Sequence, residues 1–150
     1  MIENLLIDEL MAFVAEAVKD FRLPVKNGEP RAPKVINGYL PPKRVGSDDD
    51  YPFVVVRFEN STADMEETQA EVSLIVGCYT EEFDGHTHCI NVMSRIRLAL
   101  AQMPNNTLAR KFILQYPIRV ENNPEQPYPY WQTDMTTTWI FRTPQAQFEC

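Results

Sequence analysis

The side chains with the greatest capacity for chemistry lie together in the segment His86-Thr87-His88-Cys89. Imidazole and thiolate groups bind zinc, and a cysteine beside a histidine also pairs a nucleophile with its general base. The segment begins a predicted helix, on which His86 and His88 point to opposite sides and Cys89 belongs to the apolar stripe. The sequence offers no second ligand pair with zinc-like spacing. We therefore expect surface histidines at a helix start, with no zinc site and no Cys–His relay.

The remaining candidates for a reactive site are equally incomplete. Three consecutive carboxylates, Asp48-Asp49-Asp50, cannot all converge on one ion, and no EF-hand spacing follows them. The sequence has no G-x-S-x-G, phosphate-loop, Rossmann or H-E-x-x-H motif. The aromatic cluster of Tyr128, Tyr130 and Trp131 has no interleaved basic residues, which favours packing or a protein interface over stacking on a base or a sugar. We expect a protein that is not an enzyme and takes no metal or cofactor.

Negative charge is concentrated in one part of the sequence. The net charge is −7, and no Lys or Arg occurs between Phe58 and Ser94. This window contains eight acidic residues: Glu59, Asp64, Glu66, Glu67, Glu71, Glu81, Glu82 and Asp84. Binding to a nucleic-acid backbone depends on cations that replace its counterions, so the acidic block argues against that function. Its plainest interpretation is a solvated loop that aids solubility.

The overall composition is that of one globular domain. The chain has 150 residues, of which 44% are hydrophobic, enough for a core without a disulfide or a metal. Three cysteines form no disulfide framework, which favours a reducing compartment. The opening MIENLLIDELMAF mixes acidic with apolar residues, so we expect no signal peptide. No apolar run reaches the roughly 18 residues of a membrane span, so we expect no membrane partner.

Two strands in the middle of the chain organise the predicted fold. Residues 51–58, YPFVVVRF, are apolar on both faces, which is typical of a strand inside a sheet. Residues 69–79, QAEVSLIVGCY, alternate with the period of a strand that buries one face. The ten residues from Glu59 to Thr68 are too polar to continue either strand. We therefore expect an antiparallel hairpin with a long exposed loop.

Two helices are predicted to cover this hairpin. Apolar residues recur at helical spacing over residues 2–21, and Pro24 stops the helix. A second apolar stripe runs to Met103 from a helix start at which Asp84 or Thr87 provides the cap.

Further strands complete the expected domain. They are predicted over residues 111–122, with Pro117 at an edge or a bulge, and over residues 131–143. Residues 35–40 provide one short strand more. We expect a single domain over residues 1–150, with an α+β fold in which two helices pack on a mixed, mainly antiparallel sheet of four to five strands.

A proline-rich arm over residues 24–50 separates the first helix from the central strands. Ordering a chain segment costs about 1–2 kcal/mol of free energy per residue. The few apolar residues of the arm cannot recover this cost by packing within the segment. We expect the arm to be ordered mainly by an adjacent subunit, through the apolar residues Val35, Ile36, Tyr39 and Leu40.

The order of these elements resembles that of the tail terminator, or tail completion, proteins of long-tailed bacteriophages, the group that includes the lambda minor tail protein U. The resemblance is carried by the opening helix and by the segments YPFVVVRF, AEVSLIVGCYTEEFDGHTHCINVMSRIRLAL and PYPYWQTDMTTTWIF. It spans nearly the whole chain and is one of pattern and order, not of a diagnostic motif. The resemblance implies a small α+β domain without catalytic residues.

The resemblance also implies a function and a set of partners. Copies of the chain would form a ring, usually a hexamer, that caps the tail tube, ends its polymerisation and joins the tail to the head neck. The partners would be other copies, the major tail tube protein and a head-neck connector or stopper protein, without sequence-specific nucleic-acid binding. The protein would be assembled in the host bacterial cytoplasm and reside in the virion.

Within such a ring, an acidic loop would repel the phosphates of passing DNA. We expect the loop residues Glu59, Asp64, Glu66, Glu67 and Glu71 to line the lumen, because the sequence around them lacks cations. The alternatives are another head–tail neck or completion protein, or a non-enzymatic protein-binding module.

Overall fold

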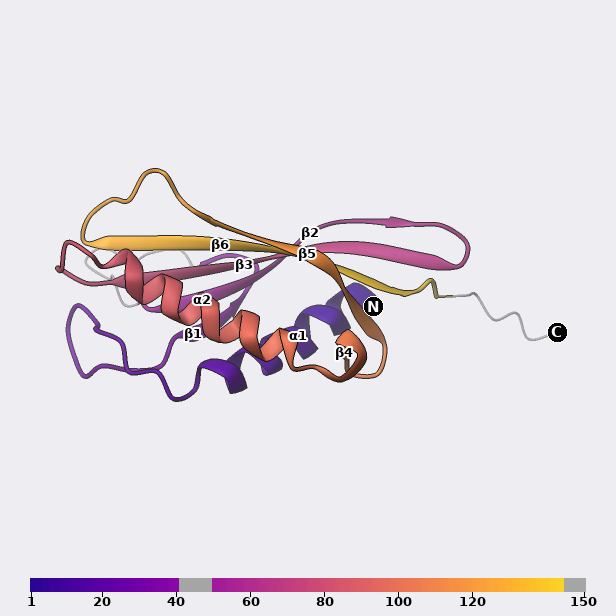
Figure 1. Ribbon diagram of the computed structural model, residues 1–150, viewed down its shortest axis with the longest axis horizontal. Helices are drawn as coiled ribbons and strands as arrows, with labels where there is room; N and C mark the ends of the chain where they lie inside the picture. The colour runs from indigo at the N-terminus through magenta and orange to yellow at the C-terminus, as the bar shows by residue number, and fades with distance from the viewer. Residues whose placement is uncertain (41–49, 145–150) are drawn as a thin grey trace.

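Two helices cover one face of a six-stranded sheet (Figure 1). The computed structural model describes residues 1–40 and 50–144. Helix α1 spans Ile2–Val18 and helix α2 spans His86–Ala101. The predicted α+β class, with two helices on a mixed sheet, is confirmed, whereas the predicted number of four to five strands is wrong. Strand β4, Thr107–Leu108, was missed because two residues carry no periodic pattern.

The strands follow the order β1-β2-β3-β6-β5-β4 across the sheet. Their bounds are Lys34–Asn37 for β1, Phe53–Ala63 for β2, Glu67–Tyr79 for β3, Phe112–Asn122 for β5 and Tyr130–Arg142 for β6. Strands β1 and β2 are parallel, and the other described pairs are antiparallel. The predicted antiparallel pairing of residues 53–58 with residues 70–79 is confirmed. Strand β6 lies beside β3 at the centre of the sheet.

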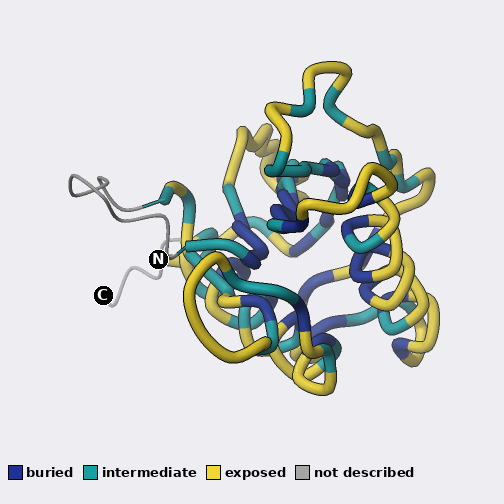
Figure 2. Tube along the Cα trace, turned by 90° about the vertical axis from the view of Figure 1, so that its left-hand side faces the viewer, coloured by how far each residue is buried: buried dark blue, intermediate teal, exposed yellow. Residues whose placement is uncertain are grey.

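The main hydrophobic core lies between the helices and the sheet, where the tube in Figure 2 is coloured as buried. Alternate residues of β3 and β6 face the helices, as the period of two requires. Trp139 of β6 is the largest fully buried side chain. Its indole Nε1 donates a hydrogen bond to Thr137 Oγ1 at 2.9 Å, and this hydroxyl donates to the Val72 carbonyl oxygen at 2.8 Å. The indole therefore fills the core without leaving its polar atom unsatisfied.

A smaller apolar cluster lies on the opposite face of the sheet. Phe53, Val55 and Ile75 are buried there, with Ile36 and Leu40 packed against them. This second cluster explains why residues 53–58 are apolar on both faces, as the sequence indicates.

The hairpin formed by β2 and β3 is more regular than predicted. The expected break over residues 59–68 is wrong, because β2 continues to Ala63 and β3 begins at Glu67. A register shift between Phe58 and Asn60 marks a bulge, after which the two strands remain paired. This part of the hairpin buries little side-chain surface, so backbone hydrogen bonds form it without any apolar alternation in the sequence.

The segment that follows α1 is folded against the same chain. Leu23 and Arg31 exchange backbone hydrogen bonds of 2.9 and 3.0 Å, and β1, with Val35 and Ile36, pairs with β2. The Arg31 guanidinium donates to the backbone oxygens of Ala32, Asp50, Tyr51 and Pro52. Residues 24–40 thus make contacts within their own chain, and the expectation that an adjacent subunit orders the arm stays a prediction. Residues 41–49 lie outside the described part of the chain.

Replacing Arg31 by alanine should destabilise the domain by about 1.5–3 kcal/mol, the usual range for lost hydrogen bonds to a charged group. Carbonyl oxygens from residues 50–52 lose their donor, which loosens the entry to β2. Urea unfolding measures the change in the free energy of unfolding.

Arg22 is the matched control, because its guanidinium bonds only to nearby carbonyl oxygens on an exposed helix end. Replacing Arg22 by alanine should change stability by less than about 0.5 kcal/mol. Equal effects of the two substitutions would contradict the role given to Arg31.

Two local predictions have different outcomes. Pro117 lies where the register of β5 against β6 shifts, so its predicted place in a bulge is confirmed.

The predicted caps of α2 are wrong: Gly85 is the N-cap residue and no side chain caps the helix. Thr87 Oγ1 instead donates to the Asp84 carbonyl oxygen at 2.8 Å. A side chain at Gly85 would meet the Trp131 indole, since a Cβ would lie 2.3 Å from its Nε1.

Candidate functional surfaces

The tip of the β2–β3 hairpin is a well-ordered turn that extends beyond the body of the domain (Figure 1). Asp64 Oδ1 accepts hydrogen bonds from the backbone N–H groups of Glu66 and Glu67, each at 2.7 Å. The Asp64 N–H donates to the Glu67 oxygen at 2.8 Å. Thr143, which follows β6, donates from its N–H to the Glu66 oxygen and from Oγ1 to the Asp64 oxygen, both at 2.9 Å. These five bonds fix a turn whose Met65 is 85% exposed.

The acidic residues expected in a lumen all lie on this hairpin. Those residues are Glu59, Asp64, Glu66, Glu67 and Glu71. Glu71 is the half-buried member, and its carboxylate accepts a hydrogen bond from Asn60 Nδ2 at 2.8 Å. The sheet places Arg142 of β6 directly opposite Glu67, although the surrounding sequence has no cation. Pairing of distant segments therefore brings a cation to the acidic tip of the hairpin, where Lys111 and Arg142 line the same hollow as Glu66 and Glu67.

Replacing Asp64 by alanine should speed the amide hydrogen exchange of Glu66 and Glu67 several-fold, because both N–H groups lose their acceptor. These bonds, first from Glu67 and then from Glu66, lower the pKa of the Asp64 carboxyl from its ordinary value of 3.8. The carboxylate therefore stabilises the turn above that ordinary pKa, and its contribution is lost as pH falls through the lowered pKa. Asparagine at this position keeps an acceptor and should protect the tip more than alanine does. Identical rates of amide hydrogen exchange at Glu66 and Glu67 in the Asp64→Ala variant and in the wild type would contradict this account.

The four residues expected at a subunit interface do not share one environment. Val35 packs against the main core, and Ile36 and Leu40 pack against the smaller cluster. Tyr39 is 70% exposed, and the Arg57 guanidinium carbon lies 4.2 Å from its ring centroid. Three of the four residues therefore contribute to the fold, and Tyr39 alone among them offers most of its side chain to a partner.

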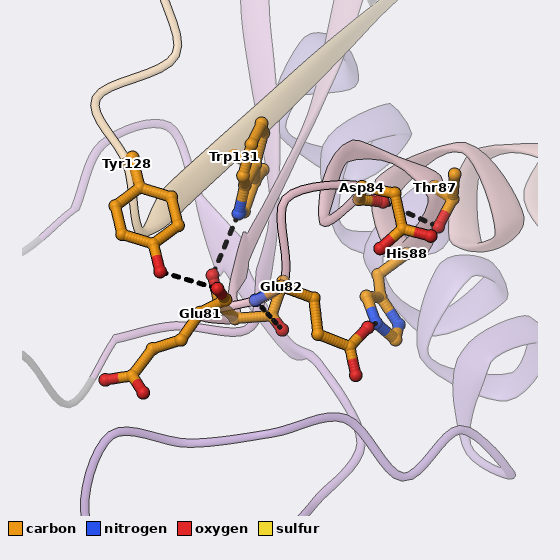
Figure 3. Close-up of polar contacts among 8 residues, drawn as sticks. Glu81, Glu82, Asp84, Thr87, His88, Tyr128 and Trp131 are labelled. Carbon is orange, nitrogen blue, oxygen red and sulfur yellow. Dashed lines mark hydrogen bonds and ion pairs between the residues drawn. The ribbon is translucent and has the colours of Figure 1, made fainter.

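An aromatic and acidic surface occupies the end of the molecule where β3 leads into α2 (Figure 3). Phe83 is 91% exposed and stacks on Tyr128 with 5.9 Å between ring centroids. The Tyr128 hydroxyl donates to the Glu81 carbonyl oxygen, and Trp131 Nε1 donates to the Thr80 carbonyl oxygen at 3.0 Å. These bonds hold the β3–α2 loop against the start of β6, so the aromatic residues are fixed in place.

His86, His88 and Cys89 do not converge on a reactive centre. Cys89 is buried, and its Sγ donates to the Trp131 carbonyl oxygen at 3.3 Å. His88 Nε2 lies 3.6 Å from a Glu82 carboxylate oxygen, as Figure 3 shows. The His86 ring lies beside the Trp131 indole, with 6.0 Å between centroids. The three side chains thus have separate surroundings.

Within residues 1–40 and 50–144, no three His, Cys, Asp or Glu side chains are placed to hold a metal ion. Asp48 and Asp49 of the aspartate triplet lie outside the described residues. A hydrogen bond with Cys89 and burial raise the pKa of the Cys78 thiol. Cys78 is therefore a neutral core residue and not a reactive thiolate.

A groove of about 240 Å³ separates the outer side of α2 from β5. It is lined by Ile90, Met93, Ser94, Arg97, Val120 and Asn122. Ile90 is 39% exposed, and neighbouring Leu98 on α2 is 54% exposed. Strand β4 pairs only with Phe112 and Ile113, and no other described strand covers the outer edge of β5. This side of the domain therefore combines a groove of mixed polarity, a cation and an open strand edge.

No protein-family model matches the sequence, and no curated protein matches it. Among the helices of the described residues, none is long and apolar enough to cross a membrane. The function must therefore be argued from the surfaces of the domain.

Proposed function

We propose that this protein is a ring-forming structural protein of a long-tailed bacteriophage. Copies of the chain assemble into a hexamer that caps the tail tube, ends its polymerisation and joins the tail to the head neck. The partners are other copies of the chain, the major tail tube protein and the head-neck connector. The resemblance in element order supports this proposal, together with the α+β domain that it implies.

The observation that carries the proposal is the outer part of the β2–β3 hairpin. Residues 58–67 are all exposed, although they form paired strands and a tightly bonded turn. Strand β6 pairs with β3 as far as Glu67, so β2 is the outer edge of the sheet here, and its exposed side chains gain little stability from burial. None of residues 58–67 belongs to the buried core, whereas an assembly protein needs an element that reaches the next subunit.

The aromatic end of the domain supports a second kind of contact. Phe83 and Tyr128 are exposed yet held in fixed positions, and Glu81 and Glu82 flank them. Rigid exposed aromatic residues are typical anchors of protein interfaces. We assign this surface to the contact with the tail tube or the connector, since the β3–α2 connection lies at the opposite end of the molecule from the hairpin tip (Figure 1).

Native mass spectrometry and negative-stain imaging of the purified protein test the proposal. We expect rings of identical subunits with a central opening. Tubes assembled in vitro from the tail tube protein of the same phage should stop lengthening when the protein is added. The proposal would be refuted if the chain stays monomeric, both alone and on tubes, and leaves the length of the tubes unchanged.

A further inference from the structure

We propose that the loop between β3 and α2 binds an arginine side chain of the tail tube protein, with the guanidinium stacked on Phe83 and attracted by the carboxylates of the same loop. The inference rests on the proposed function and deepens it, because it gives the chemistry by which the aromatic end of the domain recognises a partner. Among the proposed partners we assign the tail tube protein, since capping of the tube is the step that defines the function.

The Phe83 side chain offers an open aromatic face to a partner. Phe83 is 91% exposed, and its ring stacks on that of Tyr128 with 5.9 Å between the centroids and 23° between the planes. Because Tyr128 lies against one face of the phenyl ring, the opposite face remains open. Burial of such a ring against a partner is favourable, and its face attracts the cation of an arginine or a lysine.

The loop that carries Phe83 is held in place from two sides. Thr80 Oγ1 accepts a hydrogen bond from the Glu82 N–H at 3.2 Å. Tyr128 and Trp131 donate hydrogen bonds to carbonyl oxygens of the same loop, as Figure 3 shows. An aromatic anchor on a pre-organised loop loses little conformational entropy when it binds.

Carboxylates lie on both sides of Phe83 in the chain. Glu82 directly precedes it, Asp84 directly follows it, and both are exposed. Lys26 shares a hollow with Glu81 and Glu82, so the chain itself balances part of this negative charge. Neither Phe83 nor Asp84 lines that hollow, and in the described part of the chain no cation forms an ion pair with Asp84. The loop therefore retains negative charge beside the open aromatic face, which is complementary to a cation of a partner.

This combination of groups favours arginine over other ligands. A guanidinium is planar and weakly hydrated, so it stacks on an aromatic face better than the compact ammonium of lysine does. A nucleic acid would bring its phosphates against the carboxylates, which repel them. A neutral apolar partner would gain nothing from these charges and would partly dehydrate them. The surface therefore fits a basic, arginine-bearing segment of a protein.

Binding of the full chain to immobilised peptides tests this chemistry without any phage component. The probes are Gly-Gly-Arg-Gly-Gly, its lysine counterpart and its citrulline counterpart, which keeps the shape of arginine without the charge. We expect the dissociation constant for the arginine peptide to be at least about tenfold lower than that for the citrulline peptide, and several-fold lower than that for the lysine peptide. Equal dissociation constants for the arginine and citrulline peptides would overturn the inference.

Two variants locate the binding on the loop. Phe83→Leu keeps an apolar side chain but removes the aromatic face, so the preference for arginine over lysine should disappear. Asp84→Asn removes one charge at nearly constant size and should raise the dissociation constant for the arginine peptide several-fold. Asp8→Asn is the matched control, because it removes an exposed carboxylate from α1, and it should bind as the wild type does. If Asp8→Asn weakens binding as much as Asp84→Asn, the attraction is that of the net charge and the assignment to this loop is wrong.

Capping of tail tubes tests the contact in assembly. Phe83→Ala should still form hexameric rings in native mass spectra, because Phe83 lies outside the core, but should require about tenfold more protein to stop tube growth. If this variant forms rings and stops tubes as the wild type does, the inferred contact is wrong while the ring function stands. If the wild type itself fails to stop tubes, the proposed function is wrong and the tail tube contact falls with it, whereas the peptides decide separately whether the loop binds arginine.

Discussion

A chain with a shortened hairpin should keep its fold and lose the proposed assembly into rings. The change replaces residues 62–69 with Asn-Gly, a pair that favours the tight turn of a two-residue hairpin loop. Ser61 and Ala70 already face each other across β2 and β3, so the new turn joins positions that are in register. The deletion removes the whole tip, including Met65, and the β3 partners of residues 140–142 of β6, but no residue of the helices or of the main core.

Thermal unfolding and native mass spectrometry measure this prediction together. Unfolding should remain cooperative, with modest destabilisation because buried Thr68 is lost. The mass spectrum should contain the monomer alone under conditions in which the wild type forms rings. Met65→Leu is the control, since it keeps the hairpin and its apolar tip. Rings of unchanged size from the shortened chain would show that the hairpin has no part in assembly.

Replacing Trp139 by alanine should destabilise the domain by about 3–5 kcal/mol, the usual cost of removing a large aromatic side chain from a core. Trp139 is fully buried, and the loss would leave a cavity between the central strands and the helices. Thr137 Oγ1 would also lose its indole donor. Urea unfolding followed by circular dichroism gives the change in the free energy of unfolding.

Trp131 provides the comparison for this effect. It is only half-buried and lies at the aromatic end, so Trp131→Phe should cost clearly less than Trp139→Ala. Trp139→Phe should fall between the two, because it keeps most of the apolar volume but loses the hydrogen bond to Thr137. A Trp139→Ala chain as stable as the wild type would contradict the described core.

The parts of the fold that could be predicted from the sequence are those that bury side chains periodically. Residues 53–58 and 70–79 have a buried face, so their alternation identified two strands and their pairing. The outer hairpin has no buried face and was assigned to a loop. The contacts of Arg31 join residues about twenty positions apart, which no local pattern reports. The contacts of the arm with the entry to β2 of its own chain were therefore not predicted.

The candidate surfaces were likewise predicted from the sequence only in part. The acidic residues of the hairpin were identified because charge can be counted in a sequence. Met65 was not identified, since one apolar residue in a polar segment forms no pattern. The groove could not be predicted either, because Arg97 of α2 and Val120 of β5 meet only when the sheet is complete.

The position of Thr143 links the order of the hairpin tip to the completion of the sheet. During synthesis the hairpin leaves the ribosome well before β6, and β3 then has no neighbour on its second edge. Two of the five bonds that fix the tip come from Thr143, so they form only after β6 has emerged. A nascent or truncated chain would present a loosely held tip and would lose more entropy on docking. In the proposed ring, docking of the hairpin would therefore favour chains in which β6 has joined the sheet, a form of proofreading that requires no additional factor.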